Sequence, residues 1–111
     1  MHAFEMTELA IQRAQQGKVY LEFLRVPSMS LGVYHLPVGA HDQQLPHSED
    51  EVYYIVSGKA KITVSGEVRP VQEGSIVYVA AYDEHRFHDI KEDLTIIVFF
   101  SPAEHTNQAS D

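Results

Sequence analysis

Residues 39–58 read GAHDQQLPHSEDEVYYIVSG, and a second run, GSIVYVAAYDEHRFH, covers residues 74–88. His47 and Glu51 lie between the two glycines of the first run, and His85 lies in the second. Imidazole and carboxylate groups bind divalent metals, and two histidines with one carboxylate on separate segments can hold one ion. The two runs therefore predict a small β-barrel with a cluster of metal ligands inside it.

The composition is that of a globular protein without thiol chemistry. The chain has 111 residues, enough for one core, and 44% of them are hydrophobic. It contains no cysteine, which excludes disulfides, thiolate nucleophiles and cysteine-bound zinc. Residues 1–30 lack the pattern of a signal peptide, and no stretch reaches the ~20 apolar residues of a membrane span. We therefore expect a single cytoplasmic domain with no membrane partner.

The charge balance argues against nucleic acid as a partner. Sixteen acidic residues and eight basic ones give a formal net charge of −8. Proteins that bind nucleic acid neutralise phosphates with clustered lysine and arginine. Here the basic residues are scattered, with Lys59 and Lys61 as the tightest grouping. We expect an acidic, solvated surface instead.

The regular spacing of glycines predicts a series of short strands that follow one helix. Residues 5–16 repeat apolar side chains on one helical face, and Gly17 can end that helix. Further along, Gly58, Gly66 and Gly74 recur every eight residues, and each is expected to end a strand. The expected strands are residues 20–26, 30–36, 52–56, 59–64, 67–71, 75–81 and 94–100. Short strands at this spacing indicate an all-β sandwich or barrel.

The expected division of the single domain, residues 1–111, follows from these segments. The helix covers about residues 5–16, the barrel about residues 19–101, and a frayed, small and polar tail covers residues 102–111. The strand at 94–100 is apolar on both faces, so its second face must be covered by the helix or by another subunit. Because one short helix covers only part of a sheet, we predict a homodimer.

The first pair of candidate ligands needs a bend in the chain. In a straight strand, the Cα atoms of His47 and Glu51 would lie roughly 13 Å apart, too far for one ion. A helix starting at Pro46 would bring them together, but residues 52–56 are β-branched and aromatic, which favours a strand. We therefore expect the polar residues 48–50 to bend the chain.

The second run contributes one histidine to the same cavity. If residues 86–89 are extended, His85 lies on one face and His88 on the other. His35, in an expected strand, could be either a ligand or an ordinary core or surface residue. His41, in a loop, is a weaker candidate for a ligand. The remaining candidates are expected to have no role in the site: His2, His105, Glu49 and Asp50.

These two runs resemble the motifs of the cupin superfamily, specifically the small single-domain cupins. The first cupin motif reads G-x5-H-x-H-x3-4-E-x6-G, and Gly39, His47, Glu51 and Gly58 fit it. The second reads G-x5-P-x-G-x2-H-x3-N. Gly74 and His85 fit that motif, whereas Ala80, Tyr82 and Asp89 replace its proline, glycine and asparagine. The match spans about residues 30–100.

The resemblance implies a double-stranded β-helix, a jelly-roll barrel that is often dimeric, with a metal at its centre held by His47, Glu51 and His85. Leu45 occupies the place of the motif's first histidine, and strand geometry is expected to point it into the barrel. Three protein ligands remain, a set that suits Fe(II), Mn(II) or Ni(II), with Zn(II) also possible for these donors. The amide of Gln43 or Gln44 could act as a weak substitute ligand.

Two classes of function follow from the resemblance and the ligand set. The first is a metal-dependent enzyme acting on a small organic molecule, such as a dioxygenase, or an isomerase or lyase that uses the metal as a Lewis acid. The second is a non-catalytic cupin that binds a small molecule. A nucleophilic enzyme is disfavoured, because the chain has no cysteine and no G-x-S-x-G motif. The tyrosines expected to line the pocket are Tyr34, Tyr53, Tyr54 and Tyr78.

Overall fold

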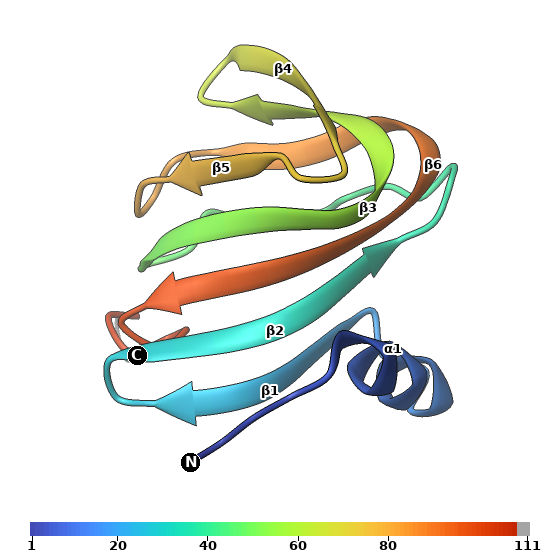
Figure 1. Cartoon of the computed structure of the whole chain (residues 1–111). Coiled ribbons are helices and arrows are strands. Elements are labelled where there is room, and N and C mark those ends of the chain that lie inside the picture. The colour runs from blue at the N-terminus through green and yellow to red at the C-terminus, as the bar shows by residue number, and fades with distance from the viewer. Residues whose placement is uncertain (109–111) are drawn as a thin grey trace.

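The computed structural model describes residues 1–108, and Figure 1 shows one curved antiparallel sheet with a single helix at its edge. The elements are α1 (Met6–Gln15), β1 (Tyr20–Val26), β2 (Met29–Leu36), β3 (Asp50–Val64), β4 (Glu67–Gln72), β5 (Ile76–Val79) and β6 (His85–Ser101). The strand order is β1-β2-β6-β3-β4, and β5 pairs with the first part of β3, on the same edge of that strand as β4. The predicted all-β architecture with a short N-terminal helix is confirmed.

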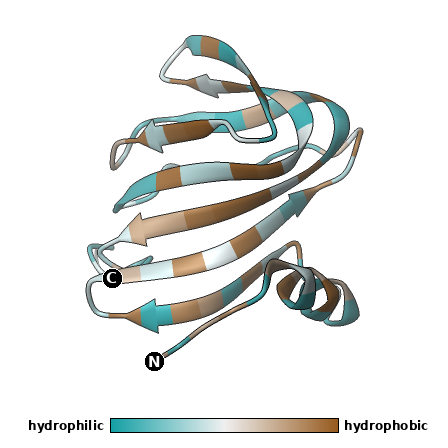
Figure 2. Cartoon of the chain, viewed as in Figure 1, coloured by the Kyte–Doolittle hydropathy of each residue, from teal (hydrophilic) through white to brown (hydrophobic). Residues whose placement is uncertain are grey.

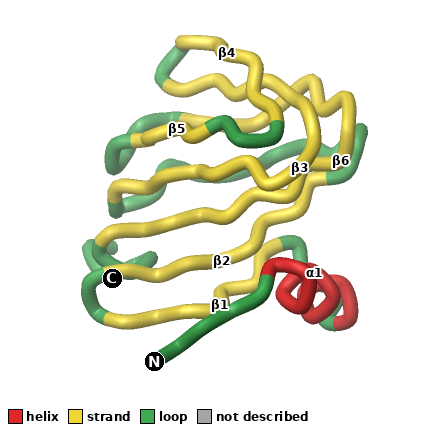
Figure 3. Tube along the Cα trace, viewed as in Figure 1, coloured by secondary structure: helices red, strands yellow, loops and turns green. Residues whose placement is uncertain are grey.

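Two long strands, β3 and β6, form the frame of the barrel. They pair along nearly their whole lengths, and both curve so that the sheet folds back toward itself (Figures 1 and 3). Apolar side chains alternate along them, so that Tyr53, Ile55, Phe87 and Ile96 are almost fully buried inside the curve. The hydropathy pattern in Figure 2 follows these strands, with the most apolar stretches along the middle of the sheet.

The prediction that Gly58 ends a strand is wrong. β3 continues through Gly58, and only its register with β6 shifts there. Gly58 has φ +105°, and a Cβ at this position would lie 2.3 Å from the carbonyl oxygen of Asp93 on β6. The glycine therefore permits an irregularity at which the two backbones approach closely. By contrast, Gly66 and Gly74 lie in the expected turns.

The prediction of a frayed tail is wrong for residues 102–108. These residues form a turn after β6, and Ala103 in it is only 2% exposed. The backbone N–H groups of His105 and Asn107 both donate hydrogen bonds to the Glu49 carboxylate. Composition could not indicate this, because the partner acid lies more than 50 residues away in sequence. Residues 109–111 lie outside the described part of the chain.

The helix covers only one edge of the sheet. Its buried Leu9 packs on the side of β1 and β2, and the helix lies beside these strands in Figure 1. It is too short and too polar to cross a membrane, and no other helix occurs among residues 1–108.

On the outer face of the sheet, Ile76 is 70% exposed and Tyr54, its partner on β3, is 39% exposed. The predicted homodimer that would cover this face stays a prediction.

We expect Gly58→Ala to destabilise the fold more than Gly66→Ala. Both glycines have positive φ, but a Cβ at Gly66 meets no atom within 4 Å. Backbone strain alone should cost Gly66→Ala about 1–2 kcal/mol of unfolding free energy. The added collision with the β6 backbone should bring the cost for Gly58→Ala to about 3 kcal/mol or more. Chemical denaturation of both variants measures the difference, and equal losses would show that the close approach is unimportant.

The homodimer is tested on the exposed sheet face. Light scattering of the wild-type protein at micromolar concentration should give the mass of a dimer. Ile76→Glu should shift the protein to monomer, because a charge buried at an interface without a partner is costly. Ile11→Glu is the matched control, since Ile11 is 57% exposed on the helix, away from this face. A monomeric wild-type protein would reject the prediction.

Candidate metal centre

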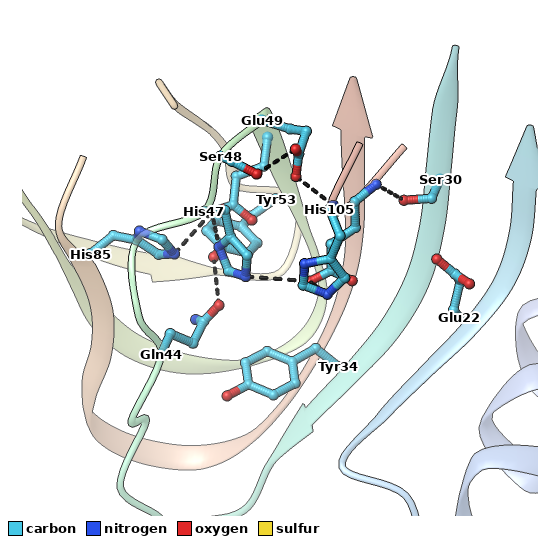
Figure 4. A network of polar contacts seen from close by, with 12 residues as sticks. Glu22, Ser30, Tyr34, Gln44, His47, Ser48, Glu49, Tyr53, His85 and His105 are labelled. Carbon is cyan, nitrogen blue, oxygen red and sulfur yellow. Dashed lines mark hydrogen bonds and ion pairs between the residues drawn. The ribbon is translucent and has the colours of Figure 1, made fainter. Parts of the chain in front are cut away.

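The three predicted ligands meet at one end of the barrel. His47 lies in the loop before β3, Glu51 is the second residue of β3, and His85 is the first residue of β6. One ligand atom from each of the three residues lies within 4.8 Å of the other two. Figure 4 shows His47 and His85 pointing toward a common space. The structure thus brings together residues from segments almost 40 positions apart in sequence.

The chain bends between His47 and Glu51, as the spacing requires. Ser48 and Glu49 form the bend, and β3 begins at Asp50. The carbonyl of His47 accepts a hydrogen bond of 2.7 Å from the N–H of Tyr82, in the turn that precedes His85. This bond ties the loop that holds the first histidine to the turn that leads to the second.

The distances around Glu51 suit a shared ion. Its Oε1 lies 3.2 Å from Nδ1 of His47 and 2.9 Å from Nε2 of His85. Two ligand atoms bound at about 2.1 Å, and at right angles to each other, would lie about 3 Å apart. The side chains of Glu51 and His85 are each only 1% exposed, so these atoms have little access to water.

Two buried atoms of this cluster have no hydrogen-bond partner. They are Oε2 of Glu51 and Nε2 of His85, whose 2.9 Å contact with Glu51 is not aligned as a hydrogen bond. Nδ1 of His85 lies 2.9 Å from the carbonyl oxygen of Asp83, which can only accept, so Nδ1 carries the proton. In the neutral ring, Nε2 then presents a lone pair to a carboxylate oxygen. Such a contact is favourable only when a proton or a metal ion lies between the two atoms, and the donor set of two imidazoles and a carboxylate fits a divalent metal.

The ionisation of the cluster shows how strongly its members interact. Burial disfavours the charge on His47, but the carboxylates of Glu104 and Glu51 outweigh it and raise the pKa of His47 to about 9. Burial likewise opposes the charge on Glu51, and its two histidine partners still hold its pKa below the usual value. The pKa of His85 is raised against burial by Glu51 and the Asp83 carbonyl. Without a metal, the carboxylates therefore favour the protonated forms of His47 and His85.

Two functional candidates were missed or misjudged from the sequence. Glu49, expected to be solvated, is 1% exposed and accepts hydrogen bonds from Ser48 and from the two backbone N–H groups of the C-terminal turn. Glu104 lies in that turn, with its Oε2 3.5 Å from Nε2 of His47. No periodic pattern in residues 102–108 marks Glu104 in the sequence. Glu104 lies next to His47 only because Glu49 binds the backbone N–H groups of the turn that contains Glu104.

The expectation that Leu45 points into the barrel is wrong. Leu45 is 79% exposed, and residues 40–49 form no strand, so strand parity does not apply there. Gln43 is also exposed, whereas Gln44 is partly buried with its amide pointing toward His47 and His85 (Figure 4). The amide oxygen of Gln44 accepts from the Tyr53 hydroxyl at 3.2 Å, and its NH₂ group donates to Asp42 at 2.8 Å.

The other candidate residues are separated from the cluster. The rings of His41 and His2 are exposed, and His88 faces away from His85, with its Nε2 2.6 Å from the Thr63 hydroxyl. His35 contacts Thr95 on β6. Among the four tyrosines, Tyr54 and Tyr78 lie on the outer surface, 39% and 60% exposed. Tyr53 is fully buried with its hydroxyl at Gln44, and Tyr34 alone of the four lines a cavity next to His47.

Two cavities reach the cluster from different sides. One, of about 190 Å³, is lined by Tyr20, Tyr34, Gln44, His47, Val98, Phe100 and Glu104. The other, of about 290 Å³, reaches His85 and is also bordered by Gln44 and Arg86. Volumes of this size admit small organic molecules rather than polymers. Gln44 borders both spaces.

The protein is an antiparallel β-barrel with two histidines and a carboxylate clustered at one end of the barrel. Comparison of the chain with known proteins identifies its family. The family model described as "Cupin domain" matches residues 32–100, and the chain belongs to this family. It is 51% identical over 104 residues to the uncharacterized protein SCO3923 of Streptomyces coelicolor, covering 94% of this chain and 99% of that protein.

Solved structures share the fold at low sequence identity. TT1209 from Thermus thermophilus has a TM-score of 0.74 at 18% identity, covering 93% of this chain and 99% of that one. An RmlC-like cupin with a double-stranded β-helix fold from Methanocaldococcus jannaschii has a TM-score of 0.69 at 20% identity, covering 76% and 79%. The double-stranded β-helix implied by the resemblance is therefore confirmed.

Gln44, rather than Leu45, should be the position at which a fourth ligand can be added. Gln44→His should raise the affinity for a divalent ion by roughly tenfold or more, because an imidazole replaces an amide that points toward the cluster. Leu45→His is the matched control, and it should leave the affinity unchanged because its side chain lies in solvent. Titration of both variants with Zn²⁺ against a chelator measures the difference. A larger gain for Leu45→His would contradict the placement of the loop.

Proposed function

We propose that the protein is a metal-binding cupin that acts on a small organic molecule through the set His47, Glu51 and His85. The observation that carries the proposal is the pair of buried atoms without hydrogen-bond partners, Glu51 Oε2 and His85 Nε2. Leaving such a group unsatisfied costs about 1–3 kcal/mol. A divalent ion at the cluster would compensate that cost and the buried charge together.

The remaining residues would provide orientation and a partly closed pocket. The 190 Å³ cavity touches His47 and is walled by Tyr34, Phe100 and Glu104, so a small ligand there would lie next to the ion. When bound, the metal supplies Lewis acidity, and Fe(II) additionally supplies a site for oxygen chemistry. The protein side chains hold the ligand and limit the access of water. An isomerase or lyase activity and a dioxygenase activity both fit this arrangement.

A second candidate function is a metal-free binding module. His47 lies within ion-pair distance of both Glu51 and Glu104, so as an imidazolium it would have two carboxylate partners without any metal. The same cavity could then hold a small ligand without catalysis. The two functions differ in whether the histidines bind a metal or protons.

Metal content distinguishes the two functions. Protein purified without added metal, or loaded with Fe(II), Mn(II), Ni(II) or Zn(II) and desalted, should hold about one ion per chain by elemental analysis. His47→Ala and His85→Ala should lose that ion, because two ligands rarely retain a divalent metal. His2→Ala and His41→Ala remove exposed histidines and should keep it. No ion in the wild-type protein would favour the binding module.

The affinity for metal should also rise with pH. A metal must displace a proton from His47, whose pKa is about 9 in the metal-free site. Below pH 9 that proton competes with the metal, so affinity should increase between pH 6 and pH 9 and level off above. Zn²⁺ competition titrations at several pH values measure this slope. An affinity independent of pH over this range would show that His47 is not a ligand.

A further inference from the structure

The C-terminal turn, residues 102–108, is fixed against the metal centre by a buried acid. Glu49 accepts hydrogen bonds from the backbone N–H groups of His105 at 2.7 Å and Asn107 at 2.8 Å. Burial opposes the charge on Glu49, but these hydrogen bonds and that of Ser48 hold its pKa below the usual value. Glu49 lies between the two ligands His47 and Glu51 in sequence, so the same bend that forms the site also anchors the turn.

Two backbone hydrogen bonds fix the position of Glu104 within the turn. Its backbone N–H donates to the Ser30 hydroxyl at 2.9 Å, and its carbonyl accepts from Arg25 Nη2 at 2.9 Å. Its carboxylate then lies 3.5 Å from Nε2 of His47 and 3.6 Å from Nε2 of His105, and its side chain is 15% exposed. The backbone is held from β1 and β2, so the carboxylate is directed at His47 by the fold.

The two histidines of the cluster have the same pattern of contacts. Each ring has one nitrogen next to Glu51 Oε1: Nδ1 of His47 and Nε2 of His85. The opposite nitrogen of His85 faces the Asp83 carbonyl, and the opposite nitrogen of His47 faces Glu104. In metal sites, an acceptor behind a histidine fixes the tautomer that leaves the other nitrogen free for the ion.

We propose that Glu104 is the positioning residue for His47: its carboxylate accepts the Nε2–H of His47 and leaves Nδ1 to bind the metal. The inference rests on the proposed metal function. It assigns a role to a segment outside the two histidine-containing runs, and it requires the 3.5 Å contact to shorten into a hydrogen bond when the ion is bound. The C-terminal turn is then a part of the metal centre.

The test compares Zn²⁺ affinity in the full-length wild-type protein, Glu104→Gln and Glu104→Ala. Loss of an acceptor behind a metal-binding histidine lowers affinity by about 10–100-fold. Glu104→Ala should show that loss, and Glu104→Gln, whose amide oxygen can still accept, should show a smaller one. Glu73→Ala, an exposed acid in a turn, is the control for the change in net charge and should match the wild type.

A second readout separates positioning from general stability. Nitrogen-15 NMR of the zinc-bound wild-type protein should show His47 protonated at Nε2 and metal-bound at Nδ1, and Glu104→Ala should lose this single tautomer. The thermal midpoint of the metal-free variants reports whether they fold. Zinc bound through Nε2 of His47, or equal affinity in all three proteins, overturns the inference alone. A wild-type protein that binds no zinc overturns the proposed function and the inference with it.

Discussion

The geometry of the site depends on carboxylates buried within one ten-residue segment. Asp42, Glu49 and Glu51 are each at most 8% exposed, and each receives hydrogen bonds or ion pairs from a different part of the chain. Asp42 accepts from the Tyr34 hydroxyl on β2 and from the N–H of Phe87 on β6. Because a buried carboxylate must be compensated, residues 42–51 can adopt this path only when the other segments are in place.

These three acids also explain why the segment needs no regular secondary structure before β3. An irregular backbone near the interior is stable when its polar groups have partners. Here side-chain carboxylates accept hydrogen bonds from the backbone N–H groups of Phe87 on β6 and of His105 in the C-terminal turn. The site is therefore held in position by the protein itself. An ion would enter a largely preformed set of ligands, which reduces the ordering required for binding.

The sequence was sufficient for the fold and for the identity of the three clustered residues. Spacing and strand propensity predicted α1, β1 and β2 closely, and the bend at Ser48 follows from the distance between His47 and Glu51. It failed where non-local contacts decide the structure. In the sequence Gly58 resembles a turn glycine, and only the fold shows the backbone of Asp93 against it. The Leu45 side chain would point into the barrel only if residues 40–49 formed a strand, and it is exposed instead. Glu104 becomes a neighbour of His47 only through the contacts of Glu49.

The arrangement of charge around His47 has a further consequence. Glu51 and Glu104 lie on opposite sides of its ring, so two carboxylates share one histidine. Without a metal, a protonated ring satisfies both, and the pKa of about 9 reflects this. With a divalent ion at Nδ1, the positive charge moves to the side of Glu51, while Glu104 retains only the Nε2–H. Glu104 is then the less compensated acid, and it borders the 190 Å³ cavity. Exchange of the His47 proton for a divalent ion would nevertheless add one unit of positive charge beside this cavity, so an anionic group of a ligand would lie toward the ion and a cationic group toward Glu104.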